Sequence, residues 1–345
     1  MQRLFKAFQG EVLAIPWRMI LFCGGLLLAF VPLITREPYI LRILTFTCVY
    51  AIYAASWDLL SGYAGQLSLG QALFFGVGAY TAAYSNTLLG LQPWATIPIG
   101  AVAAAVAGLV VGLPALRVRG VFLALVTLAF PMVATGAILA FPNVTGGDYG
   151  ITGIGALSGS MMTNYYISLA VMVTSGLVMW KLTDNRSQLV RLGIILHGIR
   201  EDEITVRASG INTVRYKLLV FGISGFFAGI AGALYAHIVK VVGTSTLELL
   251  LSLYPVIWTV FGGIMSIHGA IVGTFILYPL MEALKVAVPE VKVLIFAMVL
   301  IIVLLFMPEG LTIKIRDKIE RPCPRCGLIN VATRRVCRAC GADLY

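Results

Sequence analysis

The chain has 345 residues, of which 59% are hydrophobic and 12% are charged, and its formal net charge at pH 7 is +10. Soluble globular proteins carry about 25% charged residues, so this composition excludes a soluble enzyme, a disordered chain and a small disulfide-linked scaffold. It indicates an integral membrane protein.

Ten segments are candidates for membrane-spanning helices, which need about 20 mostly apolar residues. Strands of a membrane barrel would be about 10 residues long with alternating hydrophobicity, whereas these segments are longer and uniformly apolar. The sequence therefore predicts an all-α polytopic membrane protein with about ten transmembrane helices, some of them discontinuous, over residues 1–312. The expected spans are 19–35, 40–60, 67–89, 93–114, 120–140, 165–182, 216–238, 249–265, 269–286 and 292–307.

The distribution of Lys and Arg predicts the orientation of the spans, because cytoplasmic loops of membrane proteins are enriched in basic residues. Arg3, Lys6 and Arg18 precede the first span, whereas the loop 141–164 contains neither Lys nor Arg. Ten crossings from a cytoplasmic N-terminus put the basic stretch 183–215 and the basic C-terminal tail in the cytoplasm. We expect both termini in the cytoplasm and the first span retained as an anchor.

The segment 56–72 is unusually polar and glycine-rich for a membrane span. Asp58 is the only Asp, Glu, Lys, Arg or His between Arg42 and Arg117, and a carboxylate at such a depth costs about 2.5–3.5 kcal/mol on insertion scales, so it usually faces a cavity or a partner. Glycine-interrupted helices in transporters expose backbone groups along a pathway. The alternative is structural, with Asp58 capping the next helix and the glycines allowing tight packing. The expected pathway residues are Asp58, Gly62, Gly65, Gln66, Ser68, Gly70 and Gln71.

A second glycine-interrupted region lies at 261–273, with the sequence Phe-Gly-Gly-Ile-Met-Ser-Ile-His-Gly-Ala-Ile-Val-Gly. Broken segments in the two halves of a transporter often meet at the substrate site, so this region is the possible counterpart of segment 56–72. His268 within it is expected to be a loop residue rather than a ligand or a proton relay.

The longest polar interval before the tail follows the sixth expected span. Residues 198–209 suit a short amphipathic helix with Ile199, Ile204 and Ala208 on one side, ended by Gly210 as a C-cap. A short cytoplasmic helix that leads into a spanning helix could dock into a groove on another protein. An ordinary solvated loop with balanced charges is the alternative.

The C-terminal segment 313–345 contains two Cys-x-x-Cys pairs, each followed by glycine. Four thiolates at this spacing can converge tetrahedrally on one ion, and soft sulfur ligands favour zinc. Four protein ligands leave no open position, which predicts a small structural zinc ribbon rather than a catalytic site. Disulfide bonds are the alternative, although the cytoplasm is reducing. The expected zinc ligands are Cys323, Cys326, Cys337 and Cys340.

Sequence motifs for nucleotide binding and hydrolysis are absent. No Lys follows a Gly anywhere in the sequence, which excludes the P-loop motif G-x-x-x-x-G-K-[ST]. Zincin, nucleophile-elbow and kinase signatures are also missing, as is an aromatic-interleaved basic groove for single-stranded nucleic acid. The chain is therefore not expected to be an enzyme or to bind nucleic acid, and energy from ATP would have to come from another chain.

Sequence blocks in a fixed order resemble the permeases of ABC importers for branched-chain amino acids, in particular the M-type subunit. The most specific are the block 57–72, Trp-Asp-Leu-Leu-Ser-Gly-Tyr-Ala-Gly-Gln-Leu-Ser-Leu-Gly-Gln-Ala, and the block that begins at Ile199 with Ile-Arg-Glu-Asp-Glu. The resemblance covers roughly residues 38–312, and the tail of 321–345 is an addition to the family pattern. The remaining blocks are 116–120, 125–129, 145–151, 208–211, 215–218, 229–235, 261–264 and 307–311.

The resemblance implies a multi-pass permease of the plasma (inner) membrane of a prokaryote. Such a permease pairs with a homologous H-type permease and two cytoplasmic ABC ATPases, and it receives a branched-chain amino acid from an extracytoplasmic binding protein. ATP binding in the ATPases would rock the two permeases, each of which forms half of the pathway, between outward and inward openings. The residues that match the family's ATPase-coupling region are Arg200, Glu201, Asp202, Glu203, Ala208, Gly210 and Ile211.

Other functions stay open at this point. An importer of urea or of a short-chain amide or acid has a closely similar permease. A secondary transporter that uses Asp58 as a proton or ion site would need no ATPase and would leave the block 200–211 unexplained. A membrane-anchored scaffold would depend on the four-cysteine tail, and truncation at Glu320 would discriminate it from a transporter. Tyr149 also departs from the family pattern, in which a smaller or acidic residue is expected.

Overall fold

A computed structural model of the chain describes residues 24–25, 28–32, 35, 37–118, 120–184, 192–287, 294, 297–298, 301, 305, 310–323, 325, 329–331, 337 and 340. Within these residues the fold is helical, with two short two-stranded ribbons. About half of the span expected at 19–35 and most of the span expected at 292–307 fall outside the described residues.

The described helices follow one another along the chain and are joined mostly by short connections. They are α3 (Pro38–Trp57), the π-helical turn η2 (Asp58–Tyr63), α4 (Gln71–Thr87), α5 (Pro93–Ala115), α6 (Val121–Ala140), α7 (Pro142–Thr145), the 3₁₀ turn η3 (Gly147–Tyr149), α8 (Met161–Thr183), α9 (Leu192–Glu201), α10 (Glu203–Ala208), α11 (Thr213–Val239), the 3₁₀ turn η4 (Thr244–Leu247), α12 (Leu249–Gly262), α13 (Ile267–Ala287) and α15 (Leu311–Ile319).

Two antiparallel ribbons complete the described secondary structure. The first joins the loop after α7 to the end of α11, and the second begins directly after α15. Their strands are β1 (Ile151–Thr152) with β2 (Val241–Val242), where Ile151 faces Val242, and β3 (Glu320–Pro322) with β4 (Ile329–Val331), where Arg321 faces Asn330.

Six of the described helices are long and apolar enough to cross a membrane. The spans expected at 67–89 and 249–265 form shorter helices, since α4 has 17 residues and α12 has 14. The first is shortened because residues 64–70 are not helical. The second ends at Gly262, because Gly263 has a φ of 122° that L side chains rarely adopt. The six candidate spans are Pro38–Tyr63, Pro93–Ala115, Val121–Ala140, Met161–Thr183, Thr213–Val239 and Ile267–Ala287.

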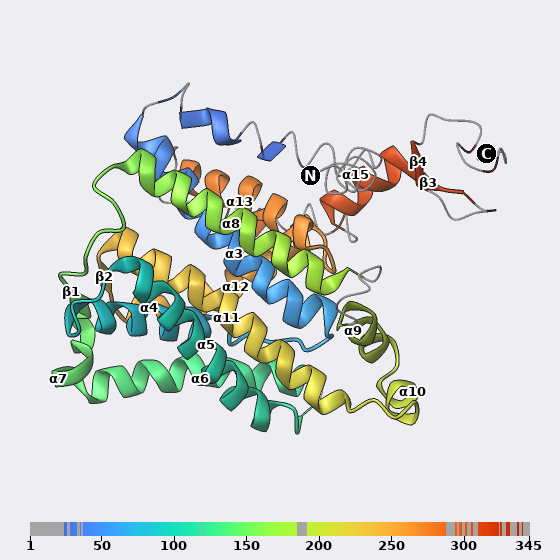
Figure 1. Ribbon diagram of the computed structural model, residues 1–345, viewed down its shortest axis with the longest axis horizontal. Helices are drawn as coiled ribbons and strands as arrows, with labels where there is room; N and C mark the ends of the chain where they lie inside the picture. Colours follow the sequence, from blue (N-terminus) through green and yellow to red (C-terminus); the bar gives the residue numbers. More distant parts are fainter. Residues whose placement is uncertain are drawn as a thin grey trace, which may run out of the picture.

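Helix α11 forms the centre of the bundle and packs against α5, α4 and α3 (Figure 1). Glycines lie where these helices cross: a Cβ atom at Gly78 would lie 2.5 Å from the Cα of Gly229, and one at Gly232 would lie 2.0 Å from the carbonyl oxygen of Phe75. Small residues allow such close approach between membrane helices, where dispersion contacts replace the hydrophobic driving force. Helices α8 and α13 pack on α3, and α12 packs on α13.

Aromatic side chains fill the region where α3, α4, α12 and α13 meet. The ring centroid of Tyr50 lies 5.0 Å from that of Tyr278, 5.4 Å from that of Trp258 and 6.3 Å from that of Phe75. Aromatic pairs at such separations add stability beyond the area that they bury. This cluster holds α3 against its neighbours about two helical turns before the chain leaves α-helical geometry at Asp58.

The two ends of the bundle carry different connections. The β1–β2 ribbon and α7 lie at one end, on the left of Figure 1, whereas α9 and α10 lie at the other end, on the right. The loop 141–164 was expected outside the cell, and the polar stretch that contains α9 and α10 was expected in the cytoplasm. The two are thus separated by the length of the bundle. Helix α15 lies at the same end as α9 and contacts α12 and α13 (Figure 1).

Candidate functional site

The glycine-rich segment forms a break in the chain between α3 and α4. The α-helix widens into the π-helical turn Asp58–Tyr63, and residues 64–70 are not helical. Side chains satisfy part of the freed backbone: Trp57 Nε1 donates to the carbonyl oxygen of Ser68 at 2.6 Å, and Ser61 Oγ donates to that of Gln66 at 3.0 Å. Non-helical backbone at membrane depth is tolerated where protein buries it in this way.

The residues expected along a pathway are mostly buried inside the protein. Gln71 is fully buried, and its Nε2 donates to the hydroxyl oxygens of Ser56 at 2.8 Å and Ser224 at 3.1 Å. These bonds join α3, α4 and α11. Of the seven expected residues, Gly65 is exposed and the other six are buried, namely Asp58, Gly62, Gln66, Ser68, Gly70 and Gln71.

Asp58 connects the two glycine-interrupted regions. Its Oδ1 accepts a hydrogen bond from the backbone N–H of Met265 at 2.9 Å, in the turn between α12 and α13. Its Oδ2 is buried and has no hydrogen-bond partner among the described residues. Asp58 therefore does not cap the next helix in the chain, α4. It instead bonds to the segment that leads into α13, where a negative charge is favoured by the helix dipole.

The regions 56–72 and 261–273, which were expected to pair, contact each other directly through Asp58, Gly62 and Met265. A Cβ atom at Gly62 would lie 2.0 Å from Asp58 Oδ1 and 3.1 Å from the backbone nitrogen of Met265. Only glycine at position 62 leaves room for both groups, so this glycine is required by the close approach rather than by its own backbone angles.

Arg200 brings the expected coupling segment to the same place. It is exposed at the end of α9, and its guanidinium donates a hydrogen bond to the carbonyl oxygen of Gly62. A Cβ atom at Gly65 would lie 3.3 Å from the Cγ of Arg200. Three sequence blocks that were identified separately, around Asp58, Met265 and Arg200, are therefore neighbours in the fold.

The coupling segment consists of two helices, and the single amphipathic helix expected at 198–209 is wrong. Ile199 is 4% exposed, whereas Ile204 is 76% exposed, so they do not share a face. The chain breaks at Asp202 because its Oδ1 accepts bonds from the backbone N–H groups of Ile204, at 2.9 Å, and Thr205, at 3.3 Å. An N-cap starts a new helix at that point.

The charge of Asp202 is stabilised by this capping. Its Oδ2 accepts a hydrogen bond from the Thr205 hydroxyl at 2.5 Å. That bond, with the backbone N–H groups of Thr205 and Ile204, holds the pKa of the Asp202 carboxyl below its usual range. At the other end of α10, Gly210 has a φ of 83°, and the chain turns there as expected.

Glu203 attaches α10 to α11. Its carboxylate accepts hydrogen bonds from Lys217 Nζ at 2.8 Å, from Arg207 at 2.8 Å and from the Thr213 hydroxyl at 3.0 Å. The side chains of Glu203 and Lys217 are only 18% and 10% exposed. The attraction within such a partly buried pair is only weakly screened. The ion pair therefore holds α10 against the start of α11.

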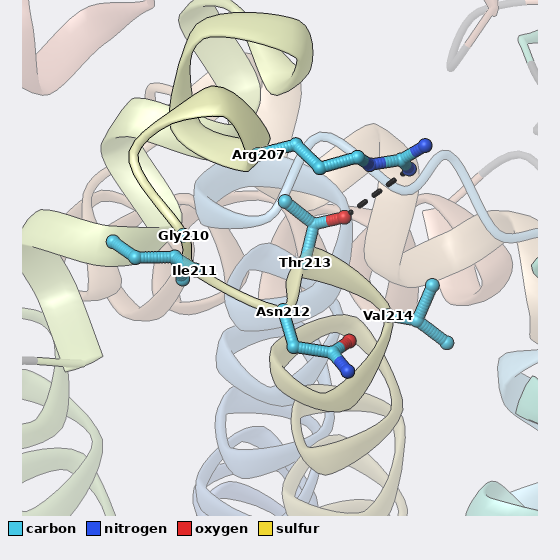
Figure 2. A pocket seen from close by; sticks show the side chains of 6 residues that line it. All are labelled: Arg207, Gly210, Ile211, Asn212, Thr213 and Val214. Atoms are coloured by element: carbon cyan, nitrogen blue, oxygen red, sulfur yellow. Dashed lines mark hydrogen bonds between the residues drawn. The ribbon is translucent and has the colours of Figure 1, made fainter.

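An open pocket of about 320 Å³ lies beside this attachment (Figure 2). Arg207 extends over Thr213, and its Nη2 lies 3.3 Å from the Thr213 hydroxyl oxygen. Two of the seven expected coupling residues, Glu203 and Ile211, are half-buried. The other five are exposed, namely Arg200, Glu201, Asp202, Ala208 and Gly210. The pocket is lined by Arg207, Gly210, Ile211, Asn212, Thr213 and Val214.

His268 is not a loop residue, which corrects the expectation. It lies in the first turn of α13, and its ring meets that of Trp180 edge to face at 5.8 Å. The turn before it is held from another direction, since the Thr312 hydroxyl donates to the carbonyl oxygen of Gly262. The start of α15 is therefore fixed to the α12–α13 turn.

Sequence reasoning missed His237 in α11. It is fully buried, with Nε2 2.6 Å from the Thr96 hydroxyl oxygen and Nδ1 2.8 Å from the carbonyl oxygen of Gly155. The residue fastens the loop after β1 to α5 and α11. The sequence did contain a signal for it, because an ionisable residue inside an apolar span usually has a specific partner.

Three of the four tail cysteines lie together. The Sγ atoms of Cys323, Cys337 and Cys340 are all within 4.8 Å of one another, and the first two residues are buried. Cys326 lies outside the described residues. The cluster could hold a metal ion, and thiolate donors suit zinc.

Comparisons of the sequence with known proteins identify its relatives. The sequence profile of the family described as branched-chain amino acid transport system / permease component matches residues 39–304. The chain is 30% identical to the high-affinity branched-chain amino acid transport system permease protein LivM of Escherichia coli K12, over 81% of this chain and 71% of that protein. No solved structure matches the chain.

More distant relatives are also named as branched-chain amino acid transport permeases. The high-affinity branched-chain amino acid transport system permease protein BraD of Pseudomonas aeruginosa is 25% identical, over 78% of this chain and 92% of that protein. The probable branched-chain amino acid transport permease protein LivH of Methanocaldococcus jannaschii is 23% identical, over 68% of this chain and 79% of that protein. The profile match covers most of the chain, which therefore belongs to the family of permease components of branched-chain amino acid transport systems.

Proposed function

We propose that the chain is the permease subunit of an ATP-driven importer of branched-chain, hydrophobic amino acids. It would form half of the translocation pathway and couple to separate ATPase subunits. The observation that carries this proposal is the meeting of the α9–α10 segment with the broken helix at Gly62, because an ATP-driven permease needs a physical route from an ATPase contact to its pathway. The names of the relatives support the substrate class.

The partners of the complex follow from the family. A homologous H-type permease would form the other half of the pathway, and the similarity of this chain to an LivH protein supports such a pairing. Two cytoplasmic ABC ATPases would bind the exposed residues of the α9–α10 segment, and an extracytoplasmic binding protein would deliver the substrate. Tyr149 is 92% exposed in η3, between α7 and β1. These two elements lie at the opposite end of the bundle from α9 and α10 (Figure 1), so Tyr149 would be available to that protein.

The proposed mechanism involves no covalent chemistry in this chain. ATP binding would draw the two ATPases together and move α9 and α10. Because Glu203 ties α10 to Lys217 in α11, that movement would tilt a spanning helix and switch the pathway between outward and inward openings. ATP would act only through the partner subunits.

The membrane topology is also part of the proposal. The permease domain, residues 1–312, would cross the plasma membrane of a prokaryote about ten times, with both termini in the cytoplasm. The α9–α10 end of the bundle would then be cytoplasmic and the β1–β2 end external. The absence of Lys and Arg from 141–164 supports that direction.

The tail, residues 313–345, would bind one structural zinc ion through Cys323, Cys326, Cys337 and Cys340. The clustered Sγ atoms of three of these residues support this ligand set. Zinc content of the purified chain tests it: one ion for each chain is expected, and the double variant C323S/C337S should contain none. A wild-type chain without zinc would refute the site.

The function is tested by co-purification of the chain with its chromosomal neighbours, followed by ATPase assays in lipid. Stimulation by a leucine-loaded binding protein would support the proposal. Stimulation only by a urea-loaded protein would favour the alternative importer of urea or a short-chain amide or acid. If no ATPase associates, the importer proposal fails and a gradient-driven transporter using Asp58 becomes the hypothesis to test.

A further inference from the structure

We propose that Arg200 is a positioning residue of the transport cycle, which transmits movement of the α9–α10 segment to the broken helix at Asp58–Tyr63 and onward to the turn before α13. This inference rests on the proposed function, because it names the contact through which the partner ATPases would act on the pathway. Arg200 would thus contact the π-helical turn within its own chain, in addition to any contact that it makes with a partner subunit.

The first step of the link is the contact between Arg200 and the π-helical turn. The guanidinium donates to the carbonyl oxygen of Gly62, and the aliphatic part of the side chain lies against Gly65. A guanidinium bonded to a carbonyl is a charge-assisted hydrogen bond, which is about twice as strong as a neutral one. A shift of α9 would therefore pull on the backbone of this turn.

The second step runs from Gly62 to Asp58. Both residues belong to the same π-helical turn, and the approach is so close that a Cβ atom at Gly62 would overlap Asp58 Oδ1 at 2.0 Å. A movement of the Gly62 backbone towards Asp58 would therefore displace the carboxylate, because little space separates them.

The third step crosses to the second broken region. Asp58 Oδ1 accepts a hydrogen bond from the backbone N–H of Met265 at 2.9 Å. Met265 has a φ of 63°, a backbone conformation that residues with a side chain rarely adopt. Releasing Asp58 would leave that partly buried N–H without its acceptor and the strained turn unsupported. Movement at Asp58 would thus reach α12 and α13.

The π-helical turn is suited to movement. Single π-helical turns occur frequently at functional sites, and Asp58 Oδ2 is buried with no hydrogen-bond partner among the described residues. An unsatisfied carboxylate oxygen raises the energy of this conformation relative to one in which it finds a donor. A movement of the turn that brought a donor to Oδ2 would lower this energy.

The experiment compares three variants of the chain in its complex with the ATPases. Arg200→Met removes the hydrogen bond and keeps the aliphatic contact, Arg200→Lys keeps the charge, and Arg215→Met removes a different exposed charge near the same end. Arg200→Met is expected to lower the amount of leucine moved per ATP hydrolysed by about tenfold, the cost of one charge-assisted bond. Arg200→Lys should recover part of this ratio, and Arg215→Met should match wild type.

A second measurement on the purified chain separates the inference from the proposed function. Hydrogen exchange at 263–266 should become faster in Arg200→Met, as it should in Asp58→Leu, which removes the Met265 acceptor directly, and stay unchanged in Arg215→Met. A wild-type ratio of transport to ATP hydrolysis in Arg200→Met would overturn the inference, as would unchanged exchange at 263–266. If the wild-type chain binds no ATPase, the function fails while the exchange result still tests the link.

Discussion

The carboxylate of Glu203 accepts a hydrogen bond from Lys217 Nζ at 2.8 Å, which joins the short helix α10 to the first turns of the spanning helix α11. Both side chains are largely removed from water. An isolated helix of six residues is unstable in water, so α10 depends on this attachment. The contact gives an exposed segment the rigidity that a mechanical connection needs.

Replacing Lys217 by Met should therefore loosen α10 without disturbing the bundle. Loss of a hydrogen bond to a charged group costs about 2 kcal/mol, which corresponds to exchange of the amides at 203–208 about 30-fold faster. Lys285→Met is the matched control, because the Lys285–Glu282 pair is more exposed and is worth at most about 1 kcal/mol. Equal effects of the two variants on their own helices would contradict this account.

The cap at Asp202 makes the stability of α10 depend on pH. The folded-state pKa of Asp202 is depressed, so its contribution is fully present above the ordinary aspartate pKa of about 3.9 and is lost as the pH falls through the lower folded-state value. Asp202→Ala should expose the amides of α10 to exchange at neutral pH.

The wild-type chain should approach that variant as the pH falls below about 4, where the carboxylate becomes protonated. Exchange rates corrected for their intrinsic pH dependence measure the convergence. A constant difference between the two chains from pH 7 to pH 3 would show that another group controls α10.

The sequence indicated where the chain breaks but not what the breaks do. Glycines and isolated polar residues identified the regions of Asp58 and Met265 because such residues are costly in lipid. That Asp58 bonds to Met265, 207 positions away along the chain, depends on how α3 and α12 pack, and a local pattern carries no such information.

The contacts of Arg200 also could not be predicted from its local sequence. Its block suggested a contact with a partner, yet its guanidinium turns inward to Gly62. Ile199 and Ile204 were expected to share a face, and the cap of Asp202 separates them. Capping by Asp is a known competitor of helix continuation, so this break was foreseeable from the sequence. The bond of His237 to Thr96 was not, because the two residues lie on different helices.

The close crossing of α4 and α11 should tolerate no methyl group at Gly232. A Cβ there would lie 2.0 Å from the carbonyl oxygen of Phe75, and overpacking of this kind costs about 1–3 kcal/mol. Gly136→Ala in α6 is the control, because nothing lies within 4 Å of its Cβ position and alanine favours helix by up to about 1 kcal/mol. Thermal unfolding in detergent should show a lower midpoint for Gly232→Ala and an unchanged or higher midpoint for Gly136→Ala.

Gly310 determines how the tail is fastened to the bundle. It has a φ of 91°, and a Cβ on it would lie 2.4 Å from the Cα of Gly263. Gly153 has a φ of 78° with nothing within 4 Å of its Cβ position, so Gly153→Ala measures the backbone strain alone, about 1–2 kcal/mol. Gly310→Ala should cost that amount plus about 1–3 kcal/mol for the clash with backbone, and it should release α15, which limited proteolysis at 311–319 would detect. If both alanine variants resist protease equally, α15 is held by its other contacts with α12 and α13, and the hydrogen bond from Thr312 to Gly262 becomes the attachment that matters.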